Sequence, residues 1–350
     1  MIELIIIYEY ERKKIGGGFH VVTMKYIAKK AGVSQSTVSR VINGSAPVNV
    51  EIREKVMALI KKLDYQPNII AQSLVGNKSL LIGVIITDIA NPFFPDIIKI
   101  IESEAAKYGY SIILCNTNYE FEKEKKYINI LKSYKVDGIL IVPCNQEMSL
   151  IKLKNIDIPS VVITQDLKGW SCVSISHYSA GKDVAKHLIN MGYSKFAFVG
   201  NKIDEKGRGF KDEIQISGFD VKKSWISIDG KHNNSIRVKL EKYIINSLEN
   251  ERIGILAYND IQALLVLHIL KGIKIAVPEK VALVGFDNTF IGKEVSPTMS
   301  SVAQPIEEIG KQSIQILIDK INHKEKIKEE HIILKTRIVV RESSLKSNKY

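Results

Sequence analysis

Short hydrogen-bonding side chains crowd the segment AGVSQSTVSRVING, residues 31–44. On a helix, Gln35 and Ser39 stand four residues apart and therefore on one side. Ser36 and Arg40 repeat that spacing on the adjacent strip. In a DNA major groove, Gln can form two hydrogen bonds with adenine, Arg can bind guanine, and hydroxyls can meet bases or phosphates. The segment therefore has the side chains that reading base pairs requires.

The opposite side of this helix is apolar. Ser34 follows a Gly32-Val33 turn and can accept hydrogen bonds from the free amides of the first helical turn. A helix, a glycine-containing turn and a second helix form the helix-turn-helix arrangement. The alternative is an ordinary helical hairpin with a polar outer face. The contact between the two helices is expected to involve Val38, Val41 and Ile42 on the second and Ile27, Ala28 and Ala31 on the first.

The charge distribution favours an anionic partner. The 350 residues include 50 Lys and Arg against 38 Asp and Glu, a net charge of +12. Residues 23–80 hold nine of the basic side chains and three of the acids, so half of the excess lies in about a sixth of the chain. Such a bias is typical of proteins that bind nucleic acid or membranes, although a solvated lysine-rich surface has the same composition.

A third helix is expected after Asn49, a suitable N-cap, because apolar residues recur at helical spacing through NVEIREKVMALIKKLDY. The next segment, PNIIAQSLVGNKS at 67–79, can begin a helix at Pro67 and Asn68, but this helix is too short to be stable alone. In a symmetric dimer, two such helices could lie in the minor groove with Leu74 wedged between base pairs. A flexible linker with an incidental leucine is the alternative.

After Leu80 the pattern changes to short apolar runs separated by amphipathic stretches. Continuous Ile, Val and Leu runs that alternate with helices are typical of parallel strands buried on both faces, so the fold class is α/β with doubly wound parallel sheets. About 260 residues with about ten strands favour two lobes with a cleft between them. The runs are LLIGVIIT, YSIILCN, VDGILIVP, IPSVVIT, FAFVG, GILAYN and VALVGFD, and covering helices are expected over 96–108, 122–134, 180–191 and 260–271.

No feature indicates export or a membrane span. The apolar run LIIIY at residues 4–8 is too short to cross a bilayer, follows an acid and lacks a basic region and a cleavage site. An odd number of cysteines in apolar runs predicts free thiols in a reducing compartment, which fits the cytoplasm. The cysteines are Cys115, Cys144 and Cys172.

Signs of catalysis are weak. The chain has no G-x-S-x-G elbow, no Walker loop and no G-x-G-x-x-G after a strand, and the cluster GRG at 207–209 is expected to be a loop. Asp260 and Asp287 could form a catalytic pair, but no recognisable general acid accompanies them. The sequence therefore predicts neither an enzyme nor a cofactor. It also predicts no metal site, because metal-ligand spacing is absent among the histidines at 20, 177, 187, 232, 268, 323 and 331.

The ordered motifs together resemble one family, the lactose-repressor/galactose-repressor (LacI/GalR) family of bacterial transcriptional regulators. The resemblance covers residues 23–343, and it implies an N-terminal helix-turn-helix, a hinge helix ordered by DNA, and a two-lobed core like periplasmic sugar-binding proteins. That core would bind a small effector and form a dimer. The motifs are AGVSQSTVSRVING, IREKV, YQPNIIAQSL, SLLIGVIITDIANPFF, VDGILIVP, NDIQA, VALVGFDN, SVAQPIEEIG and RIVVRESS.

These observations divide the chain as follows. Residues 1–22 are an extension, predicted to be disordered or a translated leader before a natural start at Val21 or Val22, with Met24 as an alternative start. The remaining parts are a DNA-binding domain at 23–66, a hinge and linker at 67–79, a core at 80–343 and a tail at 344–350. Within the core, lobe 1 is expected over about 80–164 and 305–330, and lobe 2 over about 165–304 and 331–343.

The resemblance also implies which residues meet DNA. Ser34, Gln35 and Ser36 would read bases, and Arg40 lies on the same face. Ala71 and Leu74 would enter the minor groove. Phosphates would be contacted by Thr23, Thr37, Ser39, Asn43 and Asn68. Two departures weaken the match. The family commonly has an aspartate where this chain has Lys25 or Tyr26, and an arginine where it has Gln72.

In the core, the resemblance places Phe93, Phe94, Asn259, Asp287 and Gln304 around the effector. Aromatic faces suit a sugar or base ring, and amide and carboxylate groups suit hydroxyls. Thr164 replaces the usual carboxylate after the fourth strand. The family's pocket arginine is replaced by Lys206, with Arg208 two residues later, and either could reach the cleft. Because Lys cannot bind a hydroxyl pair bidentately as Arg can, this departure bears on the effector class.

The sequence thus predicts a cytoplasmic, dimeric repressor that binds a palindromic operator of about 14 to 20 base pairs and is controlled by a small effector, a sugar or derivative. Control by a phosphoprotein that docks on the core is an alternative within the family. A solute-binding protein and a sugar-modifying enzyme are the alternatives outside it. Tetramers are not expected, because no leucine heptads follow RESS.

Overall fold

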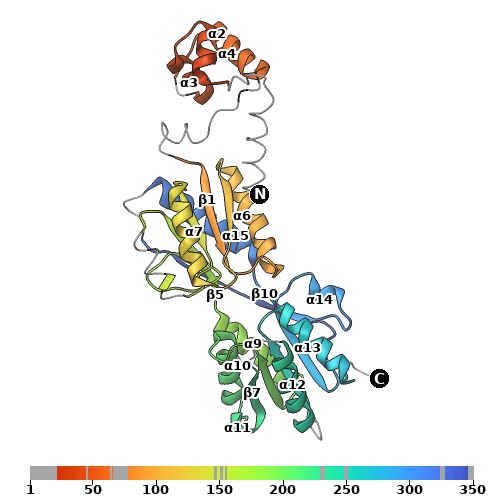
Figure 1. The fold of residues 1–350 in the computed structure, drawn as a ribbon. Coiled ribbons are helices and arrows are strands. Elements are labelled where there is room, and N and C mark those ends of the chain that lie inside the picture. The colour runs from red at the N-terminus through yellow and green to blue at the C-terminus, as the bar shows by residue number, and fades with distance from the viewer. Residues whose placement is uncertain are drawn as a thin grey trace. The chain divides into compact units, whose positions relative to one another are not determined.

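The computed structural model describes residues 22–44, 46–63, 65, 78–145, 148–149, 153, 156–228, 233–247, 251–323 and 328–345. The chain divides into two compact units, Met1–Ser79 and Leu80–Tyr350 (Figure 1). Residues 1–21 and the hinge positions Asn68, Ala71, Gln72 and Leu74 lie outside the described residues, so the predictions made for them stay predictions.

The first unit contains three helices, α2 (Met24–Ala31), α3 (Gln35–Asn43) and α4 (Val50–Lys62). Gly32 ends α2 with a φ of 71°, a left-handed conformation that glycine adopts without steric cost, so the chain can turn directly into α3. The core is shared by all three helices, as the apolar spacing predicted. Its buried members are Ile27, Ala28, Ala31, Val38, Val41 and Val56.

Side-chain caps fix where these helices begin. Ser34 Oγ accepts a hydrogen bond from the Thr37 amide at 3.1 Å, and Asn49 Oδ1 accepts one from the Glu51 amide at 2.9 Å, which confirms both predicted caps. Thr23 Oγ1 accepts from the Tyr26 amide at 3.2 Å. The start of α3 is therefore set by local chemistry, and this start decides which side chains share its outer face.

The second unit contains two six-stranded sheets. In the first, which we call lobe 1, every strand pairs in parallel, in the order β11-β5-β4-β3-β1-β2. Its strands are β1 (Leu81–Ile86), β2 (Ser111–Asn116), β3 (Gly138–Ile141), β4 (Ser160–Ile163), β5 (Cys172–Ile175) and β11 (His331–Leu334).

The second sheet, lobe 2, has the order β12-β10-β9-β8-β6-β7 and is parallel except for β12, which runs antiparallel to β10 at one edge. Its strands are β6 (Lys195–Val199), β7 (Trp225–Ile228), β8 (Ile253–Ala257), β9 (Val281–Asp287), β10 (Ser300–Ala303) and β12 (Arg337–Val339).

Helices cover both faces of each sheet (Figure 1). Ile82, Val84 and Ile86 of β1 pack in the cluster that includes α6 and α15, whereas Ile85 packs on the opposite face with α7. In lobe 2, Phe196 and Phe198 face α9 and α10, and Ala197 faces α12 and α13. The helices are α6 (Phe93–Lys107), α7 (Phe121–Ser133), α9 (His177–Asn190), α10 (Glu205–Ile216), α11 (Val221–Ser224), α12 (Asn233–Ser247), α13 (Asp260–Gly272), α14 (Ile291–Glu294) and α15 (Ile306–Asn322).

The sheets correct two of the predicted lobe boundaries. Residues 165–175 were assigned to lobe 2, but they include β5, which pairs with β4 in lobe 1. Residues 331–334 were also assigned to lobe 2, but they form β11, which pairs with β5. Both strands stand just before a connection between the lobes, and a strand of four residues carries no local sign of which sheet it joins.

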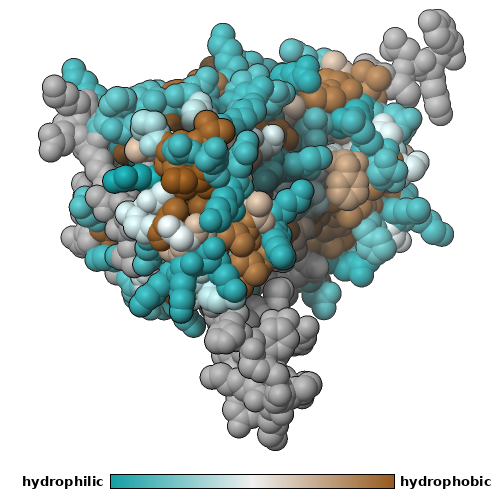
Figure 2. All heavy atoms as spheres, turned by 90° about the horizontal axis from the view of Figure 1, so that it is seen from above, coloured by the Kyte–Doolittle hydropathy of each residue, from teal (hydrophilic) through white to brown (hydrophobic). Residues whose placement is uncertain are grey.

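Polar side chains dominate the face shown in Figure 2, where hydrophobic groups form separate patches between them. Among the described residues, no helix is both long and apolar enough to cross a bilayer. The three cysteines are free thiols, with Cys115 and Cys172 buried and Cys144 partly buried.

The backbones of α9 and α10 cross so closely that no side chain fits between them at the crossing, and this allows a test of the packing of lobe 2. A Cβ on Gly209 would lie 1.9 Å from the carbonyl oxygen of Tyr178, and one on Gly181 would lie 2.0 Å from that of Lys206. We expect Gly209→Ala to lower the free energy of unfolding by about 3 kcal/mol or more, because two backbones must separate. Lys211→Ala, an exposed change on the same helix, should stay within about 0.5 kcal/mol. Urea unfolding of both variants measures this, and equal midpoints would contradict the close crossing.

Candidate functional sites

The outer face of α3 presents Gln35, Ser36 and Arg40, all exposed. Ser34 differs from them, because its hydroxyl caps the helix and also lies 2.7 Å from Ser36 Oγ and 2.8 Å from Thr37 Oγ1. The hydroxyls therefore form a small network that holds the first turn. The long amide of Gln35 and the guanidinium of Arg40 are the groups that extend from this face.

The residues predicted to meet phosphates lie around this face in different settings. Thr23 is exposed and caps α2, whereas Thr37 and Ser39 are partly buried. Asn43 is the last residue of α3, just before Gly44, whose φ is 62°. Of the predicted DNA-binding residues that the structure describes, Thr23 caps α2, and all the others lie on α3 or at its start.

A cavity of about 480 Å³ lies between the two lobes. Its lining follows the carboxyl ends of parallel strands in both sheets, where open α/β sheets bind ligands. Two of its lining residues stand where the chain passes between the lobes: His177 is the first residue of α9, directly after one connection, and Gln304 lies in the connection between β10 and α15. The predicted residues that line it are Phe93, Phe94, Thr164, Lys206, Asn259, Asp287 and Gln304.

Sequence reasoning missed several further lining residues. Tyr119, Tyr258 and His177 add rings to the cavity, and Asn91 and Asn201 add amides. Tyr258 and Asn201 come directly or almost directly after the strands β8 and β6. Their place at strand ends was the signal that could have found them.

Asp287 and Gln304 form the polar centre of the cavity. Gln304 Nε2 donates a hydrogen bond to Asp287 Oδ1 at 2.7 Å, while Gln304 Oε1 is buried and has no hydrogen-bond partner among the described residues. Desolvation raises the pKa of Asp287, and the charge of Lys206 and hydrogen bonds from Gln304 and Asn91 oppose that rise. The pair offers a ligand one carboxylate and one free amide oxygen, which are both acceptors.

Lys206, rather than Arg208, enters the cavity, which resolves the alternative that the sequence left open. Lys206 is 5% exposed, and its ammonium lies 4.0 Å from the ring centre of Tyr258 and 4.2 Å from that of Phe286. It also donates to the Tyr258 carbonyl oxygen at 3.0 Å. Arg208 is exposed, pairs with Glu205 at 2.6 Å and does not line the cavity, so Lys206 is the one of these two basic residues that reaches it.

Other predicted residues have partly structural roles. Asn259 caps α13 by accepting from the Gln262 amide at 2.8 Å, and it also lines the cavity. Phe93 and Phe94 pack edge to face with ring centres 5.3 Å apart. Thr164 has a φ of 65°, so the chain turns sharply where β4 reaches the cavity.

Asp260 and Asp287 do not form a catalytic pair. Both carboxylate oxygens of Asp260 accept hydrogen bonds, from the Thr289 amide at 2.6 Å, the Thr289 hydroxyl at 2.9 Å and the Ser301 hydroxyl at 2.6 Å. Asp260 is buried and does not line the cavity. Desolvation raises its pKa to about 6. Its role is to hold the loop after β9 against β10.

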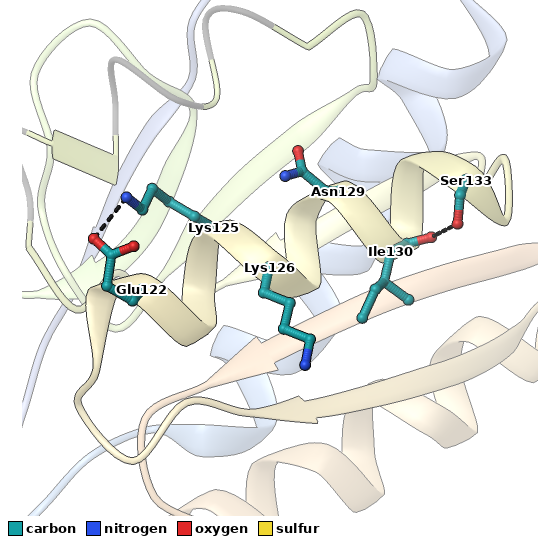
Figure 3. Close-up of a pocket in the computed structure, with 6 residues that line it drawn as sticks. All are labelled: Glu122, Lys125, Lys126, Asn129, Ile130 and Ser133. Carbon is teal, nitrogen blue, oxygen red and sulfur yellow. Dashed lines mark hydrogen bonds and ion pairs between the residues drawn. The ribbon is translucent and has the colours of Figure 1, made fainter. Parts of the chain in front are cut away.

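A second depression runs along α7 (Figure 3). Its side chains come from this one helix, and Lys125 pairs with Glu122 at 2.6 Å. Ser133 donates to the Ile130 carbonyl oxygen at 2.7 Å. Glu122, Lys126, Asn129 and Ser133 are exposed, so this is a solvated helix face without the convergent polar groups of the cavity.

The sequence predicted no metal site from histidine spacing, and that expectation stays a prediction, but three side chains with metal-ligand chemistry lie close together in the described residues. Asp166, Cys172 and His331 lie together, with their ligand atoms all within 4.8 Å of one another. Spacing along the sequence could not reveal this cluster, because parallel pairing of β5 with β11 brings His331 beside Cys172.

Comparison with known proteins agrees with the two units. A family model described as bacterial regulatory proteins, lacI family, matches residues 23–68, and one described as a periplasmic binding protein-like domain matches residues 185–344. The HTH-type transcriptional regulator DegA of Bacillus subtilis (strain 168) is 32% identical over 333 residues, covering 92% of this chain and 98% of that protein. The chain belongs to the LacI family. Its relatives are transcriptional regulators and not enzymes.

Other relatives and structures extend this comparison. Catabolite control protein A of Priestia megaterium is 32% identical over 333 residues, covering 92% of this chain and 99% of that one. A periplasmic binding protein/LacI transcriptional regulator from Alkaliphilus metalliredigens QYMF, complexed with D-xylulofuranose, is 30% identical with a TM-score of 0.64 and covers 76% of this chain and 99% of its own. The lac repressor dimer bound to operator and the anti-inducer ONPF shares the fold, with a TM-score of 0.81 at 24% identity over 93% of this chain and 99% of its own.

Because His177 is partly buried in the cavity, we expect the free energy of unfolding to depend on pH. Desolvation, assisted by the charge of Lys206, lowers the pKa of His177 to about 3, below its ordinary value of 6.5. The unfolded chain therefore binds a proton that the folded chain does not, and stability from this group is lost as pH falls below about 6.5. Between pH 7 and pH 5 the loss should be about 2 kcal/mol.

Urea unfolding of the parent and of His177→Gln at both pH values isolates this contribution, since glutamine does not titrate. We expect the variant to lose about 2 kcal/mol less than the parent over this range. Equal losses would show that His177 is protonated normally in the folded protein.

Proposed function

We propose that the chain is a sequence-specific repressor that binds a palindromic operator as a homodimer in the cytoplasm and is controlled by a sugar or sugar derivative in the cavity between its lobes. Membership of the LacI family supports regulation of transcription. The observation that carries the proposal is the exposed Gln35 and Arg40 face on a capped helix, in the same chain as a cavity lined by ring faces and hydroxyl-binding groups.

DNA reading rests on α3. Gln35 and Arg40 suit adenine and guanine, respectively, and the short Ser36 between them lets the helix approach the base edges. The phosphate contacts proposed for Thr23, Thr37, Ser39, Asn43 and Asn68 would set the position of the helix without reading sequence. Ala71 and Leu74 are proposed for the minor groove, where an inserted leucine would bend the duplex.

The effector proposal rests on the acceptors of the cavity. Asp287 and the unpartnered Gln304 Oε1 both call for hydrogen-bond donors, which sugar hydroxyls supply. The faces of Phe93 and Tyr258 suit the apolar side of a sugar ring. The solved relative that holds D-xylulofuranose supports the same class of ligand.

Control follows from where the cavity lies. Three short segments connect the lobes, between β5 and α9, between β10 and α15, and between β11 and β12. A ligand that contacts His177 and Gln304 touches one of these segments directly and the helix residue that follows another. Its binding energy can therefore favour one lobe orientation. If that orientation alters operator affinity by some factor, operator binding must alter effector affinity by the same factor, because the two equilibria are linked.

Selection from a pool of random duplexes with purified protein tests the DNA function. An inverted repeat should be enriched, and Gln35→Ala should lose about tenfold to a hundredfold of the preference for that repeat over a repeat changed at one base. Glu54→Gln, an exposed change on α4, serves as the control and should keep the preference. A pool that shows no enrichment with the parent protein, with or without added sugars, would refute sequence-specific binding.

Sugar binding is tested separately, by thermal shift and calorimetry against a panel of monosaccharides and disaccharides that includes D-xylulose and cellobiose. Asp287→Asn should weaken binding of the best sugar by about tenfold to a hundredfold, because a charged acceptor is lost. Arg208→Ala, which alters the neighbouring exposed position on α10, should leave affinity unchanged. A panel without any ligand, or equal losses in both variants, would contradict the sugar proposal and leave the DNA function standing.

A further inference from the structure

Three segments of lobe 1 place metal-binding side chains together, away from the cavity. Asp166 lies in the loop between β4 and β5, Cys172 begins β5, and His331 begins β11. Parallel pairing of the two strands sets His331 directly opposite Cys172. None of the three lines the cavity. They are the one set of three such residues with converging ligand atoms in the described part of the chain.

The distances between the ligand atoms fit a tetrahedral ion. His331 Nδ1 lies 3.3 Å from Cys172 Sγ and 3.3 Å from Asp166 Oδ1, and Cys172 Sγ lies 3.6 Å from Asp166 Oδ1. Zinc bonds of about 2.0 to 2.3 Å at tetrahedral angles separate neighbouring ligand atoms by about 3.3 to 3.6 Å.

The backbone holds the ligands in this arrangement. The Cys172 amide donates to the Glu330 carbonyl oxygen at 2.8 Å, and the Glu330 amide donates to Ser171 Oγ at 3.2 Å. Cys172 is fully buried, whereas the side chains of His331 and Asp166 are 33% and 53% exposed. The sulfur is therefore anchored in the sheet, and solvent reaches the other two ligands.

We propose that Asp166, Cys172 and His331 bind one zinc ion per chain, with water as the fourth ligand. A thiolate, an imidazole and a carboxylate are the ligands that zinc takes in proteins, and three protein ligands leave one position open. Binding displaces the Cys172 thiol proton to solvent, and His331 binds through Nδ1 while its proton lies on Nε2. No electron transfer is involved.

The ion would join the two strands that end at connections between the lobes. β5 ends at Ile175, before the first connection, and β11 ends at Leu334, before the third. β11 is the edge strand of its sheet, with β5 as its single neighbour. Zinc would therefore strengthen the pairing of the edge strand β11 with β5. It would also stabilise the folded chain, because an ion that binds only the folded state adds to its stability.

Cobalt is the probe for this site. Full-length protein without a histidine tag is treated with a chelator, kept reduced with a phosphine, and titrated with Co²⁺. We expect a near-ultraviolet thiolate-to-cobalt charge-transfer band and visible bands of a tetrahedral site, saturating at one ion per chain and bleached by Zn²⁺. Zn²⁺ should also raise the unfolding temperature of the parent.

Two variants and a control test whether Cys172 and His331 are the metal ligands. Cys172→Ser should remove the charge-transfer band and the zinc-dependent thermal shift. His331→Gln, at an exposed position, should keep the fold and weaken cobalt affinity by more than the roughly tenfold to hundredfold that the loss of outer-shell partners causes. Cys115→Ser, which alters the other buried cysteine, should keep both signals. The absence of a saturable band in the parent, or a band that survives Cys172→Ser, would overturn the proposal.

Discussion

The second unit must hold two opposite charges, Lys206 and Asp287, largely out of water between its lobes, and this constraint governs how the cavity is built. Lys206 is almost fully buried, and Asp287 is partly buried in the same cavity. An ion that leaves water loses several kcal/mol of solvation unless other groups replace the water. Two aromatic faces and the Tyr258 carbonyl oxygen do so for Lys206, and Gln304 does so for Asp287. Gln304 stands in a connection between the lobes, so the charge balance of the cavity depends on how the lobes are joined.

The position of Lys206 in turn depends on the helix that carries it. Asp204 accepts a hydrogen bond from the Lys206 amide at 2.8 Å and so fixes the first turn of α10. Residues two apart on a helix point to different sides, which separates Lys206 from Arg208. The carbonyl of Lys206 then packs against Gly181 of α9. The sequence motif could name both basic residues, but only the cap and the close crossing decide which one is buried.

Local periodicity explains why so much of the architecture could be predicted. The apolar face of α3 and the long runs of β1, β6, β8 and β9 are signals that a few neighbouring residues carry, and the structure confirms them. The strand β11 is different, because its pairing with β5 joins residues 159 apart in the sequence. Neither strand shows locally which sheet it enters, so the lobe boundaries were misplaced and the cluster around Cys172 was missed.

The three connections between the lobes differ in how they relate to the cavity. Any change in lobe orientation must be absorbed by the backbone of all three at once, since each is short and begins and ends in a sheet or a helix packed on one. Gln304 lies in one of them, and His177 directly follows another, so a ligand in the cavity acts at or beside these two connections. The third lies between β11 and β12 and has no residue in the cavity lining. Its freedom depends instead on how firmly β11 is held to β5, and this is the pairing that the proposed zinc would tighten. Effector and metal would therefore act on the same motion through separate connections, and their effects on it would combine without any contact between the two sites.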